Sequence, residues 1–162
     1  MRNRPLLIAT AVAALLLAAA PAAQARIRVN KSIAGVQLGM SSQRVFAILG
    51  RPARRQKGEE GITTLIYRYH RIHVLLVEEQ NNFFDVFSVQ TTSPKEKTRA
   101  GIGVGSTEKA LRRRLHGERC RNFPNGRACI QGGNSGGTAT ETDYEIGRNH
   151  RVTAVRIFAG DF

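Results

Sequence analysis

Tryptophan is absent from this chain of 162 residues, and cysteine occurs only twice. Acidic residues are also scarce, since 12 Asp and Glu stand against 25 Lys and Arg. Two cysteines alone do not complete the four-ligand set of a structural zinc site, and the few carboxylates offer little material for paired acid and base catalysis. The charged fraction of 23% is ordinary for a globular protein of one domain or two small ones, which excludes a fully disordered chain.

Long hydrophobic runs are missing as well, apart from one at the N-terminus. Two arginines precede an apolar stretch from Leu6 to Ala20, and Ala23-Gln24-Ala25 has the small-x-small pattern of a cleavage site. The stretch is shorter than the ~20 residues that span a bilayer, and no cysteine lies near the cleavage site to accept a lipid. We predict a signal peptide over residues 1–25, cleaved after Ala25, and a secreted or periplasmic protein that is soluble after cleavage.

The two cysteines predict a disulfide. Cys120 and Cys129 flank Phe123-Pro124-Asn125-Gly126, and its Asn-Gly pair favours a tight turn. Such a turn brings two strand arms together, and export places the chain in an oxidising compartment. A Cys120–Cys129 bond closing so short a loop stabilises by roughly 2 to 3 kcal/mol in the chain-entropy model.

An internal similarity at an offset of 66 residues organises the rest of the chain. It aligns Gly35–Ser41 with Gly101–Thr107 and also pairs aliphatic residues farther along, such as Val86 with Val152. We predict two copies of one supersecondary unit, residues 26–96 and 97–162, in one compact body.

Each copy predicts one helix followed by three strands. Ser41 and Thr107 can accept hydrogen bonds at a helix start, and Gly50 and Gly117 stop the two helices. Segment 51–61 is polar and predicts an exposed turn at Gly58–Gly61, and the glycine-rich segment 132–137 predicts a flexible connection. The runs rich in β-branched and aromatic residues, which predict strands, are 62–69, 72–77 and 83–91 in the first copy and 127–131, 138–146 and 152–158 in the second. The fold class is therefore α+β, a tandem repeat of one helix plus a three-stranded antiparallel meander, with the helices packed on the sheet.

Two segments of the first copy resemble a known family. Gly39-Met40-Ser41 through Val45, and Ile48-Leu49-Gly50-Arg51-Pro52, resemble the repeat of the SmpA/OmlA outer-membrane assembly lipoprotein domain. They are also similar to the β-lactamase-inhibitor-protein-like proteins, which carry two tandem copies. The resemblance implies a secreted or periplasmic protein-binding module that has no catalytic chemistry and no cofactor. It does not extend to a lipidated cysteine or to the contact residues of any inhibitor.

One segment resembles a catalytic loop. Gly133-Asn134-Ser135-Gly136-Gly137 is similar to the nucleophile loop of trypsin-like serine proteases, although Asn134 stands where that family has Asp. A serine hydroxyl needs a base held by a third group, and no histidine here lies in a matching motif. We expect a flexible loop and keep a hydrolase using Ser135 as a remote alternative.

Histidines and carboxylates predict no metal site and no acid and base pair. His70 and His73 lie three residues apart on a strand, so their side chains point to opposite faces. Glu141 and Asp143 share one strand face, but in so basic a chain we expect that face to be solvated.

Positive charge is the strongest remaining signal. One basic cluster follows the first predicted helix and another lies on the second, and such clusters attract anionic polymers, membrane surfaces or acidic proteins. A nucleic-acid partner is disfavoured by export and by the scarcity of aromatic stacking platforms. The candidate binding residues are Arg54, Arg55, Lys57, Tyr67, Tyr69, Phe84, Arg112 and Arg113.

The sequence therefore predicts an exported binding module that is not an enzyme. Its expected partner is a cell-envelope or extracellular protein, docked through the sheet surface or the basic rim. The alternative is a binder of anionic envelope polymer or membrane surface that acts through the arginine and lysine clusters.

Overall fold

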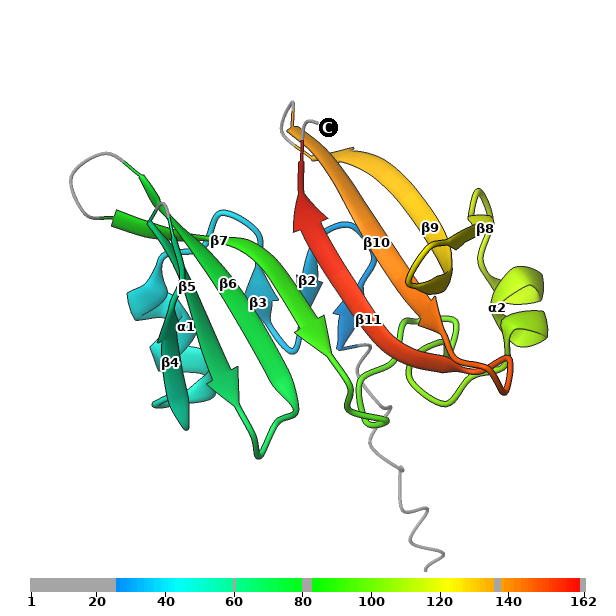
Figure 1. Ribbon diagram of the computed structural model, residues 1–162, viewed down its shortest axis with the longest axis horizontal. Coiled ribbons are helices and arrows are strands. Elements are labelled where there is room, and N and C mark those ends of the chain that lie inside the picture. The colour runs from blue at the N-terminus through cyan, green and yellow to red at the C-terminus, as the bar shows by residue number, and fades with distance from the viewer. Residues whose placement is uncertain (1–25, 60, 80–82, 136–137, 161–162) are drawn as a thin grey trace, which may run out of the picture.

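The computed structural model describes residues 26–59, 61–79, 83–135 and 138–160 (Figure 1). The predicted signal peptide and its cleavage site after Ala25 lie outside these residues. The side chains of Phe84 and Ser135 are also outside the described part.

One antiparallel sheet of eight strands dominates the molecule (Figure 1). Its strands are β4 (Arg54–Lys57), β5 (Ile62–Tyr67), β6 (Ile72–Glu79), β7 (Phe83–Thr91), β8 (Arg119–Phe123), β9 (Gly126–Ser135), β10 (Thr138–Ile146) and β11 (Val152–Ala159). Their order across the sheet is β4-β5-β6-β7-β11-β10-β9-β8. The strands β4–β7, here called the N-terminal segment, thus join the strands β8–β11, the C-terminal segment, along β7 and β11, where Val155 lies opposite Thr91.

Two short helices and a small second sheet complete the described structure. They are α1 (Ser42–Leu49), α2 (Glu108–Arg114) and the three-stranded sheet of β1 (Ile27–Arg28), β2 (Ser32–Ile33) and β3 (Val36–Gln37). In the view of Figure 1, α1 and the small sheet lie behind the large sheet, and α2 lies beside its β8 end. None of these described helices is long and apolar enough to cross a membrane.

The predicted tandem repeat of a helix and a three-stranded meander is wrong. The structure is mostly β, each helix is followed by four strands, and the eight strands form one sheet beside a smaller one. Strand β4 lies in the polar segment 51–61, before the predicted turn at 58–61 and where no strand was predicted, and β9 continues through Gly132 and Gly133, predicted as a flexible connection. Polar residues and glycine have weak strand propensity, so pairing with β5 and β10 determines both strands.

The N-terminal segment buries an apolar layer between its sheet and α1. Buried and more exposed residues alternate along β5 and β6, and register places buried Leu65 opposite buried Val74. Val45 and Leu49, one helical turn apart, are the buried residues of α1 and belong to the same core. The sequence pattern predicted this helix and its stop at Gly50, whose N–H donates to the Phe46 carbonyl.

The C-terminal segment continues this core around Tyr144. Tyr144 lies opposite Cys129 on one side and Val155 on the other, and its ring is fully buried. Burial raises the pKa of the Tyr144 hydroxyl. The predicted disulfide is present and joins Cys120 to Cys129, which lie directly opposite each other on β8 and β9.

A glycine lets the small sheet approach the large one. The backbone N–H of Asn30, in the turn between β1 and β2, donates to the Thr142 hydroxyl at 2.7 Å. A Cβ atom at Gly133 would collide with the Asn30 amide. The glycine-rich part of β9 is therefore a packing surface for the N-terminal turn.

Candidate binding surface

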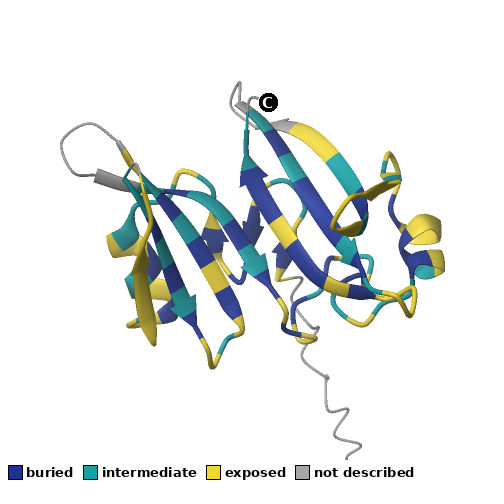
Figure 2. Ribbon diagram, in the orientation of Figure 1, coloured by how far each residue is buried: buried dark blue, intermediate teal, exposed yellow. Residues whose placement is uncertain are grey.

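The side of the large sheet opposite α1 and the small sheet is here called the uncovered face. Figure 1 looks onto this face, and no described helix or strand lies over it. Figure 2 shows that burial alternates along its strands, as where exposed His73 lies between buried Ile72 and Val74. Since strand side chains alternate between faces, His73 and its cross-strand neighbours belong to the uncovered face.

Within the N-terminal segment the uncovered face carries four aliphatic side chains, with Thr64 and His73 between them. Ile62 lies opposite Val77, and Leu75 and Ile66 lie on the same side of neighbouring strands. All four side chains are partly exposed. We call these four residues the aliphatic patch, because contiguous apolar side chains on a surface are typical of a contact site.

Within the C-terminal segment the same face is charged. Glu141, Asp143 and Glu145 lie in one row on β10, and the Asp143 Oδ2 atom accepts a hydrogen bond from Arg156 Nη2 at 3.0 Å. Asp143 is only 7% exposed, and its Oδ1 atom has no hydrogen-bond partner among the described residues. The expected solvation of this row is therefore wrong for Asp143, because Arg156 covers and pairs with it.

A furrow runs along β9 between the acidic row and two arginines of β8. It has a volume of about 230 Å³ and is lined by Arg119, Arg121, Ile130, Gly132 and Glu141. Register explains the arrangement, because Ile130 lies opposite Asp143 on one side and Arg119 on the other. We call this feature the charged furrow, since its two walls carry opposite charge and its floor is uncharged.

A second charged site forms where α2 begins. The Thr107 hydroxyl accepts a hydrogen bond from the Ala110 N–H and caps the helix. The next residue, Glu108, binds Arg127 of β9 through two arms, with Nη2 to Oε1 at 2.7 Å and Nε to Oε2 at 3.1 Å. The hydrogen bond from Arg127 holds the pKa of Glu108 below its usual value, and the Glu108 carboxylate raises the pKa of Arg127.

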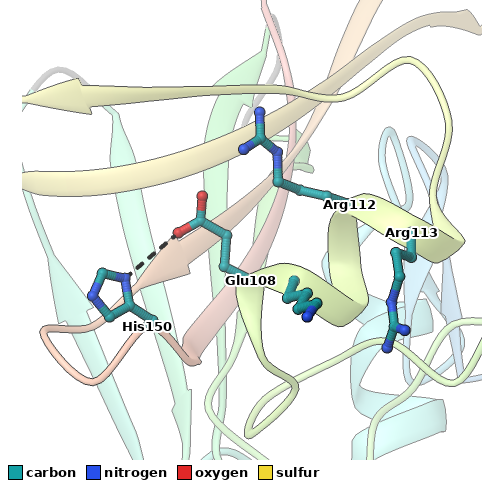
Figure 3. A pocket seen from close by; sticks show the side chains of 5 residues that line it. Glu108, Arg112, Arg113 and His150 are labelled. Atoms are coloured by element: carbon teal, nitrogen blue, oxygen red, sulfur yellow. Dashed lines mark ion pairs between the residues drawn. The ribbon is translucent and has the colours of Figure 1, made fainter.

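Beside Glu108 lies an open basic pocket, shown in Figure 3. Its volume is about 540 Å³, and its lining consists of Glu108, Lys109, Arg112, Arg113 and His150. His150 Nδ1 lies 3.9 Å from Glu108 Oε2. Because Arg127 already pairs with Glu108, the lining presents mainly cationic groups to a ligand. We call this site the α2 basic pocket.

One group of potential metal ligands comes together in the described residues. The Glu108 carboxylate and the sulfur atoms of Cys120 and Cys129 lie within 4.8 Å of one another. Both sulfurs are joined in the disulfide, and Arg127 holds the carboxylate. The group therefore offers no set of free ligands.

The structure separates the two predicted basic clusters. Arg54, Arg55 and Lys57 are exposed on β4, which is one edge of the large sheet. Arg112 and Arg113 are exposed on α2, beside the opposite edge (Figure 1). No single surface therefore includes both clusters. Charged side chains on an edge strand also discourage pairing with other chains.

The predicted aromatic residues differ in exposure. Tyr69, in the turn between β5 and β6, is 92% exposed, whereas Tyr67 is 2% exposed and lies in the core. Burial raises the pKa of Tyr67 to about 12, and the nearby charge of Arg55 opposes the rise. Of these two residues, only Tyr69 is available to a partner.

The charged furrow and the Glu108 contacts were missed by sequence reasoning. Alternation on β10 did place Glu141 and Asp143 on one face, but their arginine neighbours come from strands β8 and β11, whose register the sequence does not show. Arg127 is likewise distant from Glu108 along the chain.

Comparison with known proteins finds solved structures with a similar fold but identifies no family. No protein-family model and no curated protein sequence matches the chain, so the resemblance to the SmpA/OmlA domain stays a prediction. One similar solved structure is an extracellular protein containing a SCP domain from Bacillus anthracis, at 12% identity and a TM-score of 0.50, covering 82% of this chain and 48% of that one. Another is a DUF4309 family protein from Bacillus subtilis, at 14% identity and a TM-score of 0.50, covering 85% and 90%. The chain thus spans about half the length of the first of these proteins, and at such identities the likeness concerns the fold alone.

Proposed function

We propose that this protein is an exported, non-catalytic binding module whose uncovered face docks a protein of the cell envelope. The observation that carries the proposal is that an aliphatic patch and a charged row lie on one uncovered sheet face. Protein interfaces combine an apolar centre with charged groups that select the partner. We infer a partner with an apolar protrusion for the aliphatic patch.

Three features support export. The N-terminal sequence has the pattern of a cleaved signal peptide, the cysteines form a disulfide, and one structural neighbour is an extracellular protein. The hydrolase alternative rests on Ser135 alone, which is the last residue of strand β9, and it remains the remote alternative.

A paired substitution tests the docking surface. Leu75→Glu places a charge in the aliphatic patch, and Gln37→Glu places the same charge at an exposed position of β3, on the other side of the large sheet. Mature protein is cross-linked to envelope extract at low and moderate salt, and the captured proteins are quantified by mass spectrometry. We expect Leu75→Glu to lower capture at least tenfold and Gln37→Glu to leave it unchanged. Equal capture by both variants, or no partner for the unmodified protein at either salt concentration, rejects the proposal.

The α2 basic pocket favours a second candidate function, binding of an anionic envelope polymer. Lys109, Arg112 and Arg113 line one open site, and such a site binds phosphate groups with an affinity that falls as salt rises. Polyphosphate serves as the probe. We expect the triple glutamine variant of this pocket to bind more weakly than the triple glutamine variant of Arg54, Arg55 and Lys57, which removes the same charge elsewhere. Salt-independent affinity rejects this candidate.

A further inference from the structure

The walls of the charged furrow call for a ligand with both signs of charge. Arg119 and Arg121 form one wall, and Glu141 of the acidic row lines the other. A phosphate ion would be attracted by the two arginines but repelled by the carboxylate of the opposite wall. A metal cation would be attracted by that carboxylate but repelled by the arginines. A zwitterion satisfies both walls, and leaving a charged group unpaired on binding is unfavourable.

The floor of the furrow is open. A Cβ atom placed on Gly132 would meet no atom within 4 Å, and the Gly132 backbone lies outside the left-handed region. A side chain could therefore be introduced there without backbone strain, and it would fill the space that a ligand occupies. Ile130, partly exposed on the same strand, provides an apolar contact next to this space.

An unused acceptor lies beside the furrow. Asp143 is more than nine-tenths buried, and its Oδ1 atom has no hydrogen-bond partner among the described residues. Its cross-strand neighbour on β9 is Ile130, which lines the furrow. The Oδ1 atom of Asp143 has almost no accessible surface, and Asp143 does not line the furrow, so Glu141 is the carboxylate that a ligand in the furrow meets.

The width of the furrow sets the size of the ligand. The acidic row on β10 and the arginines on β8 are two strand spacings apart, or about 10 Å. An extended tripeptide spans about 10 Å. The terminal ammonium and carboxylate groups of a tripeptide can therefore reach opposite walls while its backbone crosses Gly132.

We propose that the charged furrow binds a short peptide with free termini, with the ammonium group at Glu141 and the carboxylate at Arg119 and Arg121. This inference rests on the proposed binding role of the uncovered face. It requires neither the aliphatic patch nor a protein partner.

Three peptides test the charge requirement. Amide resonances of the mature, isotope-labelled protein are followed by NMR during titration with tri-alanine, N-acetyl-tri-alanine and tri-alanine amide. We expect tri-alanine to shift resonances of β8, β9 and β10 with a Kd of about 1 mM. Each blocked peptide should bind at least tenfold more weakly, because one wall of the furrow then remains unpaired.

Variants locate the site. Gly132→Val fills the floor and should abolish the shifts, whereas His73→Val, an exposed position on the same face in the N-terminal segment, should not. If Gly132→Val does not fold, Arg119→Gln replaces it and should reduce binding of tri-alanine to the level of its amide.

Several outcomes overturn the inference. They are the absence of shifts up to about 20 mM tri-alanine, equal binding of the three peptides, and unchanged binding by Gly132→Val or Arg119→Gln. Failure here is distinguishable from failure of the docking proposal. If Leu75→Glu abolishes envelope capture while tri-alanine causes no NMR shifts, the docking proposal stands and only the peptide site is rejected.

Discussion

The N-terminal and C-terminal segments of the large sheet share one local connection but are stabilised differently. Gly39 N–H donates to the Val86 carbonyl and Gly105 N–H to the Val152 carbonyl, each at 2.8 Å. In both places the loop before a helix is thereby attached to a strand of the sheet. The same backbone geometry occurs twice, although the side chains around it differ.

Apolar packing dominates the N-terminal segment, and covalent and ionic contacts supplement it in the C-terminal one. Helix α1 buries Val45 and Leu49. Helix α2 buries a single apolar residue, Leu111, and its other buried residue is the ion-paired Glu108. The disulfide then attaches edge strand β8, whereas the other edge strand, β4, has no such bond. The comparison teaches that backbone hydrogen bonding does not dictate which side-chain chemistry stabilises a segment.

The largest effect should come from removing the apolar anchor of α2. Leu111 is fully buried, and Leu111→Ala should lower the free energy of unfolding by about 3 kcal/mol, as expected for a buried leucine. Ile48→Ala on α1, where the side chain is 43% exposed, is the control and should cost below about 1 kcal/mol. Urea denaturation measures both values. A loss for Leu111→Ala no larger than for Ile48→Ala would show that polar contacts alone position α2.

Removing the disulfide should have the next largest effect. Replacing Cys120 and Cys129 by alanine should cost about 2 to 3 kcal/mol, because the bond closes a short loop. Hydrogen exchange should accelerate in β8 and change little in β4. Equal acceleration at both edges would contradict a local role for the bond.

Helix α1 and the disulfide could be predicted from sequence because their signals are local. Val45 and Leu49 repeat at helical spacing before Gly50, and an Asn-Gly turn separates the cysteines. The register of β7 on β11 could not be predicted, because it joins segments more than 60 residues apart.

The candidate sites were less predictable than the fold, because they too depend on the pairing of strands that are distant along the chain. The burial of Asp143 depends on Arg156 of the next strand, and the charged furrow requires β8 to pair with β9 beside the acidic row. Gly133 was predicted to be part of a flexible connection, whereas in the structure it lies in β9 and the Asn30 side chain packs against it. The function of these residues arises from strand pairing over long range.

A smaller effect should come from the ion pair of Glu108 and Arg127. Glu108→Gln should lower the free energy of unfolding at pH 7 by about 1 kcal/mol, since Arg127 is 31% exposed and solvent weakens the interaction. The pKa of Glu108 is lowered in the folded protein. Its contribution is therefore present above the unfolded pKa and is lost as the pH falls through the folded pKa.

Unfolding measured from neutral to acidic pH checks this contribution of Glu108. The stability difference between the unmodified protein and Glu108→Gln should shrink as the pH falls. Arg127→Lys is a matched variant that keeps the charge but removes the two-armed hydrogen bond, and it should reproduce part of the loss. A difference that grows towards acidic pH contradicts the assignment.

The smallest effect, with the opposite pH dependence, should come from Glu96, which lies between the two segments. Glu96 is 3% exposed and pairs with Arg26 at 3.3 Å. Burial raises its pKa, and the positive charges of Arg26, His70 and Lys95 oppose the rise. Its contribution is thus fully present below the unfolded pKa and is lost as the pH rises through the folded pKa. Glu96→Gln should therefore gain stability over the unmodified protein from acidic to neutral pH, by less than about 1 kcal/mol. If the stability differences of Glu96→Gln and Glu108→Gln from the unmodified protein changed in the same direction with pH, the two carboxylates would be stabilised in the same way. That result would contradict the opposite pH dependence expected here.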